Sequence, residues 1–232
     1  LDLDSTAGIS DAGATDVTVG GLADVNGTSI SLGGGTFDAG TLTFNSAGAV
    51  AISEDSSTDI VGSNTAGSLD LDSTAGISDA GATDVTVGAL ADVNGTSISL
   101  GGGAFDAGTL TFNSAGAVVI SEDSSTDLVG SNTADSLDLD STAGISDAGA
   151  TDVTVGALAD VNGTSISLGG GTFDTGTLTF NSAGAVVISE DSSTDIVGSN
   201  TAGSLDLDST AGISDGGATD VTVGALADVI GT

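Results

Sequence analysis

The chain contains one kind of acidic doublet, a glutamate followed by an aspartate, and it occurs three times. The doublets are Glu54-Asp55, Glu122-Asp123 and Glu190-Asp191. Paired carboxyl groups can supply the acid and the base of glycoside hydrolysis. However, neighbouring residues of a strand point to opposite faces, and the chain has no Lys, Arg, His or Tyr to assist a reaction. We therefore expect no catalytic residue and no enzymatic activity.

The same carboxylates could bind a hard cation, because Ca²⁺ takes oxygen ligands. One further aspartate follows each doublet, so each candidate site has three carboxylates. The candidate ligands of a weakly held Ca²⁺ or other divalent cation are Glu54, Asp55, Asp59, Glu122, Asp123, Asp127, Glu190, Asp191 and Asp195. The alternative, which we favour, is that each doublet lies in a solvated turn. We expect no required cofactor.

A glycine-rich segment, Gly33-Gly34-Gly35-Thr36-Phe37-Asp38, is a second candidate. It resembles the calcium-binding nonapeptide of β-roll proteins, Gly-Gly-x-Gly-x-Asp-x-apolar-x. It departs from that pattern because Thr36 replaces the third glycine, and because the segment is isolated instead of recurring in consecutive turns. We favour a glycine-rich corner over a calcium site here.

The elements that position these residues belong to a long tandem repeat. The segment that begins at Leu1 returns at Leu69, Leu137 and Leu205. The full copies are residues 1–68, 69–136 and 137–204, and residues 205–232 begin a fourth. No linker separates the copies, so we expect one continuous domain over residues 1–232. Near-identical copies in tandem favour a linear stack of repeats, in which every copy has nearly the same surroundings.

Alternation with a period of two predicts strands throughout the repeat. Leu1-Asp2-Leu3-Asp4, Ile30-Ser31-Leu32 and Leu42-Thr43-Phe44 each place apolar side chains on one face and polar side chains on the other. Gly and Asn, which tolerate a positive φ, punctuate the strands. We therefore predict an all-β fold, a right-handed parallel β-helix or β-solenoid with about three coils per 68-residue repeat. An antiparallel sandwich is the alternative.

The coil boundaries that we expect are 66–90, 91–114 and 115–133. Under this division, equivalent residues of successive copies recur every third coil. Asp2, Asp4 and their equivalents then project outward about 14 Å apart along the stack, from a rise of roughly 4.8 Å per coil. Their expected role is solubility and protection against lateral aggregation. Phe44 is expected in the core, and the core is also favoured for Phe37.

The charge of the chain is unusual, because 33 carboxylates carry a net charge of −33 and no cationic side chain is present to form an ion pair. About ten coils would carry roughly one negative charge per 1.5 Å, close to the ~1.7 Å of double-stranded DNA. We therefore expect dissolved cations to bind and stabilise the protein. Repulsion excludes nucleic acid and anionic membranes as partners. No apolar run reaches the roughly 20 residues of a membrane helix, so we expect no membrane insertion.

Two segments carry a resemblance to a known group of proteins. The run from Ala66 to Ser78 and the run from Leu110 to Ile120 resemble the repeats of filamentous-haemagglutinin-type adhesins and giant bacterial surface proteins. The resemblance implies a secreted right-handed β-helix used as a stalk, fibre or adhesive shaft. The function that we expect is a structural segment of an extracellular or cell-surface filament. The alternative is the shaft of an adhesin that binds glycan or a host surface through regions outside this chain.

The chain itself is the remaining expected partner. A solenoid needs atypical terminal repeats to keep its ends soluble, and none is recognisable. Neither an initiator methionine nor a signal peptide is visible, so the chain is expected to be part of a longer polypeptide. We expect it to continue covalently or to stack end to end on further copies.

Overall fold

The computed structural model describes the whole chain, Leu1–Thr232, as strands joined by short turns, without any helix. The chain consists of two compact units. Unit 1 comprises Leu1–Ala115 with Val119–Ser121, and unit 2 comprises Gly116–Val118 with Glu122–Thr232. Strand β13 (Ala117–Glu122) contains residues of both. The continuous domain expected over residues 1–232 stays a prediction, and each unit is described by itself.

Many strands of both units are short, although β12 has 18 residues, and most strands alternate buried and exposed residues. In unit 1 they are β1 (Asp2–Asp4), β2 (Ile9–Ser10), β3 (Val17–Asn26), β4 (Ile30–Leu32), β5 (Phe37–Asn45), β6 (Ala49–Glu54), β7 (Thr58–Ile60), β8 (Ser63–Ala66), β9 (Ser68–Ser73), β10 (Gly76–Asp79), β11 (Asp84–Gly95) and β12 (Ser97–Ser114). In unit 2 they are β14 (Thr126–Leu128), β15 (Ser131–Ala134), β16 (Ser136–Ser141), β17 (Gly144–Asp147), β18 (Asp152–Asn162), β19 (Ser165–Leu168), β20 (Thr172–Asn181), β21 (Ala185–Glu190), β22 (Thr194–Ile196), β23 (Ser199–Ala202), β24 (Ser204–Ser209), β25 (Ile213–Asp215), β26 (Asp220–Val223) and β27 (Ala227–Gly231).

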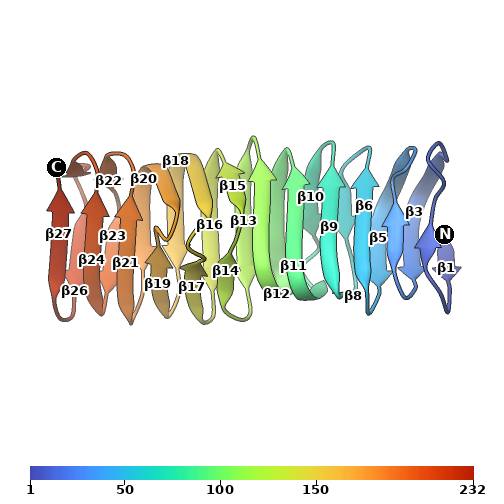
Figure 1. The fold of residues 1–232 in the computed structure, drawn as a ribbon, viewed down its shortest axis with the longest axis horizontal. Coiled ribbons are helices and arrows are strands. Elements are labelled where there is room, and N and C mark those ends of the chain that lie inside the picture. The colour runs from blue at the N-terminus through green and yellow to red at the C-terminus, as the bar shows by residue number, and fades with distance from the viewer. The chain divides into compact units, whose positions relative to one another are not determined.

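Each unit is a parallel β-solenoid, which confirms the predicted fold class and excludes the antiparallel sandwich. In unit 1, β6 pairs with β9 and β9 pairs with β11, all in parallel, and Figure 1 shows these three strands side by side. In unit 2, β21 pairs with β24 and β24 with β27, again in parallel. The chain therefore returns in the same direction once per turn, as a solenoid requires.

The predicted lengths of the first two coils are wrong. The number of residues between two paired positions gives the length of one turn. In unit 1 this separation is shortest between Leu42 and Ile60 and longest for pairs such as Asp2 and Asp24. The predicted coils 66–90 and 91–114 are both longer than either separation. The predicted boundaries follow from the premise that glycines separate the strands, whereas glycines such as Gly88 lie inside β3 and β11. These positions are β-bulges inside continuous strands, where the register shifts between Val87 and Leu90.

Three turns of unit 1 therefore use fewer residues than one copy of the repeat. Successive pairings build one stack from Ile9 through Ile30 and Val50 to Leu69, so three steps from Ile9 end at Leu69. They fall short of Ile77, the equivalent of Ile9 in the second copy. Ile77 lies in a different stack, where its paired neighbours are Thr58 and Ile98. Equivalent residues of successive copies are thus not aligned every third coil, contrary to our expectation.

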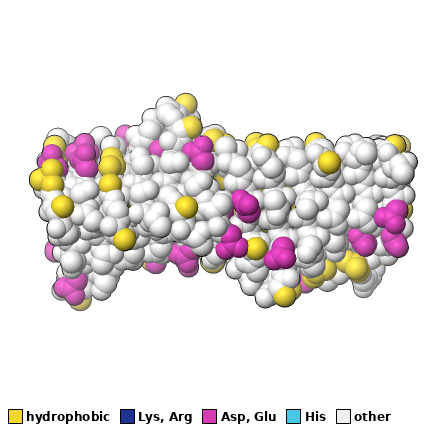
Figure 2. Space-filling model, turned by 90° about the horizontal axis from the view of Figure 1, so that it is seen from below, with side chains coloured by type: hydrophobic (Ala, Val, Ile, Leu, Met, Phe, Trp, Pro, Cys, Tyr) yellow, Lys and Arg dark blue, Asp and Glu magenta, His cyan; other side chains and the backbone are white.

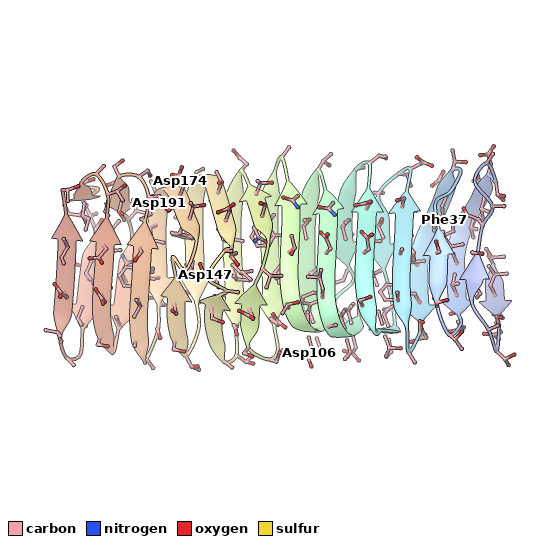
Figure 3. All side chains as sticks on the ribbon, viewed as in Figure 1. Phe37, Asp106, Asp147, Asp174 and Asp191 are labelled. Atoms are coloured by element: carbon pink, nitrogen blue, oxygen red, sulfur yellow. The ribbon has the colours of Figure 1, made fainter.

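The core of each unit is narrow and consists of the inward residues of every strand. Phe37 and Phe44 are completely buried in unit 1, and Phe173 and Phe180 in unit 2, which confirms the core prediction for both positions. Figure 3 labels Phe37 on β5. Burial of one such side chain contributes about 1.5–3 kcal/mol. Because β-branched, Leu and Phe side chains occupy mainly the inward positions, the alternate positions are left for Asp, Ser and Thr.

Candidate functional site

The outward positions of β9 bring carboxylates together in a way that sequence analysis missed. Leu69 and Leu71 point inward and are buried, so Asp70 and Asp72 point outward. Strand β11 lies beside β9 in parallel register, with Asp92 opposite Asp70 and Asn94 opposite Asp72. Two carboxylates therefore occupy adjacent positions on neighbouring strands, which are about 4.8 Å apart.

The same carboxylate pair recurs in every copy of the repeat. We call these in-register neighbours the cross-strand aspartate pairs. Their members are Asp2 and Asp24, Asp70 and Asp92, Asp138 and Asp160, and Asp206 and Asp228. Like charges directly opposite each other on neighbouring strands are destabilising. Figure 2 shows many acidic side chains and no basic side chain on the face that it presents.

Burial, and after it repulsion between carboxylates, raises the pKa of several of these carboxyls. Burial is the largest cause for Asp70, whose pKa is above its ordinary value, and the charges of Asp72 and Asp92 add to it. The pKa of Asp138 is raised in the same way, by burial and then by its acidic neighbours. For Asp160, burial raises the pKa and the side chain of Asn162 partly opposes the change. A cation beside these pairs would relieve the repulsion.

A ladder of side-chain amides borders the first three pairs, whereas Ile230 takes the place of the asparagine beside the fourth. In unit 1, the Asn94 Nδ2 group donates to Asp72 Oδ1 at 2.9 Å and to Asp92 Oδ1 at 3.1 Å. Asn113 Nδ2 in turn donates to Asn94 Oδ1 at 3.0 Å. The first copy has the corresponding bonds from Asn26 to Asp4 and from Asn45 to Asn26. These amides direct positive dipoles at the carboxylates and hold them in place on the outer face.

Two shallow grooves of unit 1 lie beside these ladders, at equivalent positions of two copies. The first, of about 340 Å³, is lined by Asp4, Ser5, Thr6, Asn26, Gly27 and Thr28. The second, of about 360 Å³, includes the equivalents Asp72, Ser73, Thr74, Asn94, Gly95 and Thr96. Carboxylate, hydroxyl and carboxamide groups line both grooves, and no aromatic side chain does.

The predicted doublet does not lie in a solvated turn, because its glutamate is buried. Glu54 continues the inward alternation of Val50 and Ile52 on β6 and is only 2% exposed. Glu122 and Glu190 are each 1% exposed. Glu54 Oε1 accepts a hydrogen bond of 2.6 Å from the Ala39 N–H group. The interpretation of Glu54, Glu122 and Glu190 as solvated residues is therefore wrong.

The structure does not bring the three carboxylates of each candidate metal site together. Asp55 accepts a hydrogen bond from the Phe37 N–H group at 3.2 Å, and Asp59 accepts one from the Ser78 hydroxyl at 3.3 Å. Asp127 and Asp195 likewise accept bonds from serine hydroxyls one turn further on. No group of three carboxylates with an arrangement suited to a metal ion is present in the structure. Weak cation binding by single carboxylates stays a prediction.

The third doublet resembles the first but has more hydrogen-bond donors. Glu190 Oε1 accepts bonds from Thr175 N at 3.1 Å and from the Ser192 hydroxyl at 2.7 Å, and the Thr194 hydroxyl donates to Oε2. Asp191 accepts a bond from the N–H group of Phe173. Figure 3 labels Asp191 and Asp174 near each other at one edge of unit 2. The second doublet, Glu122 and Asp123, has its glutamate beside the Ser124 hydroxyl.

The glycine-rich segment binds a carboxylate, not a cation. The Asp11 carboxylate accepts hydrogen bonds from Gly33 N at 2.9 Å and from Gly34 N at 3.1 Å. Gly33 has a φ of +114°, so its N–H group and that of Gly34 turn toward the same carboxylate. The Gly33 N–H group, with those of Gly34 and Gly35, holds the pKa of Asp11 below its ordinary value. The segment is a corner, as we favoured, and its exposed donors suit an anion.

The same arrangement of an aspartate carboxylate and two glycine N–H groups, which we call the carboxylate nest, recurs in the other two full copies. Asp79 accepts bonds from the Gly101 and Gly102 N–H groups in unit 1. Asp147, labelled in Figure 3, accepts them from Gly169 and Gly170 in unit 2. Each of these contacts joins one turn of the solenoid to the next, once in every full copy.

Two sets of residues were not predicted from the sequence, although the spacing of both along the chain contains a signal. Asp24, Asp92 and Asp160 each follow the first aspartate of their copy by one turn of the solenoid. Asp11 precedes Gly33 by the same distance along the chain. With the length of a turn known, the sequence would have predicted both the cross-strand aspartate pairs and the contact between Asp11 and Gly33.

No family model, curated protein or solved structure matches this chain. The structure also has no helix of the length and apolar character that crossing a membrane would demand.

Proposed function

We propose that the chain is a structural repeat segment of an extracellular filament, stalk or matrix fibre, and that dissolved cations stabilise it. Its partners in this proposal are those cations and further solenoid turns, either of the same polypeptide or of further copies stacked end to end. Neither nucleic acid nor membrane is a partner, and catalysis is not part of the role.

The observation that carries the proposal is the recurrence of cross-strand aspartate pairs on a chain without any cationic side chain of its own. A pair such as Asp70 and Asp92 costs stability unless ions from solution screen it. The cost recurs with every copy, so it scales with the length of the chain. A protein with this surface suits a salt- or mineral-rich exterior, where cations are plentiful. Ca²⁺ and other divalent cations are the proposed ions, and none is required as a cofactor.

A fibre role is further supported by the way in which the turns are joined. Each turn within a unit is hydrogen-bonded to the next along parallel strands, for example over the full length of β6 and β9. The side-chain ladder from Asn113 to Asn94 to Asp72 runs in the same direction. Repeated bonds between successive turns resist extension along the stacking direction.

The two grooves favour a second candidate, the shaft of a surface adhesin. Their hydroxyl, carboxamide and carboxylate groups can hydrogen-bond to sugar hydroxyls, although no aromatic residue is present to stack on a sugar ring. Resemblance to filamentous-haemagglutinin-type adhesins belongs to this proposal as well. In this second role the ligand-binding regions lie outside the chain.

Electron microscopy of the native assembly, isolated in buffer with Ca²⁺ and after chelation, tests the proposal. Long, smooth filaments that fragment or swell after chelation are the expected result. Short spikes with distinct heads would favour the adhesin. Globular particles in both buffers would contradict both candidates.

A further inference from the structure

Glu54 is a titratable group inside unit 1 that the proposed function does not use. Its side chain occupies the inward position after Val50 and Ile52 on β6, at the point where the chain turns toward β7. The residue is 2% exposed, and Thr58, which begins β7, is completely buried. The carboxyl group therefore has almost no access to bulk solvent in the folded state.

Only one of the two carboxyl oxygens of Glu54 has a hydrogen-bond partner. Oε1 accepts the Ala39 N–H group at 2.6 Å. Oε2 makes no hydrogen bond, and neither does the hydroxyl of Thr58, although both atoms are buried. A buried polar atom without a partner is costly, and a buried ionised oxygen is more costly still.

No cationic side chain compensates Glu54, because the chain has no Lys, Arg or His. The titratable groups around it are all acidic: Asp38 on β5, Asp55 in the following turn and Asp72 on β9. Burial is the main cause that raises the pKa of Glu54, and the charge of Asp38 adds to it. The Ala39 N–H group and the nearby Thr58 and Ser56 hydroxyls oppose the rise in pKa.

We propose that Glu54 retains its proton in the folded protein at neutral pH and uses it to latch the turn between β6 and β7. The proton on Oε2 is donated to the Thr58 hydroxyl oxygen, so both unpartnered atoms are satisfied at once. The Thr58 hydroxyl keeps its own proton and acts as the acceptor. When the pH rises, the carboxyl releases its proton to solvent, and the resulting carboxylate draws the turn open to reach water. The latch is thus a proton-binding site that opens under alkaline conditions.

Glu190 provides a useful contrast in unit 2. Its carboxyl group accepts bonds from the Thr175 N–H group and from the Ser192 and Thr194 hydroxyls. Three donors hydrogen-bond to Glu190 and can support an ionised carboxylate, whereas the Ala39 N–H group is the one donor hydrogen-bonded to Glu54, with the Thr58 and Ser56 hydroxyls nearby. We therefore place the latch at Glu54.

The direction of the pH dependence follows from the raised pKa. The folded state holds the proton more tightly than the unfolded chain, whose glutamate has an ordinary pKa of 4.5. The stabilisation is complete below that value and is lost as the pH rises through the pKa of the folded state.

Infrared spectroscopy of the folded chain near neutral pH tests whether the Glu54 carboxyl group is protonated. The test variant is Glu54→Gln. Gln has nearly the shape of a neutral glutamic acid, and its amide N–H can donate to Thr58. Asp84→Asn is the matched control, because it also removes one carboxylate from unit 1, at an exposed site flanked by Ser63 and Ala104. The expected result is a protonated-carboxyl carbonyl band in the wild type and in Asp84→Asn that is reduced in Glu54→Gln.

Thermal melting gives a second readout. Glu54→Gln is expected to melt above Asp84→Asn at about pH 8, with the difference vanishing by about pH 4. The proposal is overturned if the band is unchanged in Glu54→Gln, or if Glu54→Gln melts below Asp84→Asn at the higher pH. Failure of Glu54→Gln to fold at neutral pH would also overturn it, since a neutral side chain is what the proposal requires.

Discussion

Replacement of Asp92 by asparagine tests whether a cross-strand aspartate pair really costs stability. Asp92 lies opposite Asp70 on β9, and its other neighbour in register is Thr111. Asparagine keeps the shape of the side chain, and its oxygen can still accept the bond from Asn94. The change therefore removes one charge and leaves the packing of β11 in place.

The expected magnitude follows from the spacing of the strands. Two unit charges about 5 Å apart repel by ~0.8 kcal/mol in water. We expect Asp92→Asn to raise the free energy of unfolding by about 0.5–1 kcal/mol at low ionic strength, or ~2–4 °C in Tm per kcal/mol. At about 1 M salt, where the Debye length is ~3 Å, the gain should nearly disappear.

Asp84→Asn is the control, because Asp84 lies on the same strand with Ser63 and Ala104 opposite it. Both variants have the same net charge, so long-range repulsion falls equally in the two. Urea unfolding of the wild type and both variants, at ~0.01 M and ~1 M NaCl, is the assay. Equal stabilisation by the two variants at low salt would refute the reasoning, because the repulsion between Asp70 and Asp92 would then make no measurable contribution to stability.

Two further predictions concern the carboxylate nest. Asp11→Asn should lower the free energy of unfolding by about 1–2 kcal/mol at neutral pH, because it replaces a charged acceptor facing the Gly33 N–H group. The folded-state pKa of Asp11 is depressed below 3.8, so the stabilisation by the Asp11 carboxylate is present above that value and is lost as the pH falls through the folded-state pKa. Urea unfolding of the wild type and of Asp11→Asn at several pH values across this range measures the difference in stability. A difference that does not change with pH would contradict the prediction. Gly35→Ala should cost at least about 1–3 kcal/mol, since its Cβ would lie 2.2 Å from the Thr15 carbonyl oxygen. Gly20→Ala is the control for thermal melting, because nothing lies within 4 Å of its Cβ; equal Tm values for the two alanine variants would count against the packing.

The solenoid could be predicted from the sequence because the alternation of residues such as Ile30, Ser31 and Leu32 is a local property. It could not predict the length of a turn, since a glycine at a corner and a glycine at a bulge look alike in sequence. Gly88 lies in a bulge of β11, whereas Gly33 has a positive φ and makes a corner. Which of these a glycine adopts depends on the strand of the next turn, and that contact is not local.

The prediction of the candidate site failed in part for the same reason. The alternation of Val50, Ile52 and Glu54 is visible in the sequence and places Glu54 inward. The doublet was nevertheless expected in a solvated turn, because acidic side chains are usually exposed. The cross-strand pairs, by contrast, needed the knowledge that Asp70 and Asp92 lie one turn apart, which only the register supplies. Charge and composition alone predicted cation dependence without saying which carboxylates are responsible.

Thermal melting of the chain in Ca²⁺ and in Na⁺, at matched ionic strength, tests the central claim most directly. The cross-strand aspartate pairs predict that Tm rises with ionic strength in both salts and that it rises further with Ca²⁺ than with Na⁺, because a divalent ion neutralises two adjacent carboxylates at once. A Tm that stays constant from very low to high ionic strength, in either salt, would contradict the account.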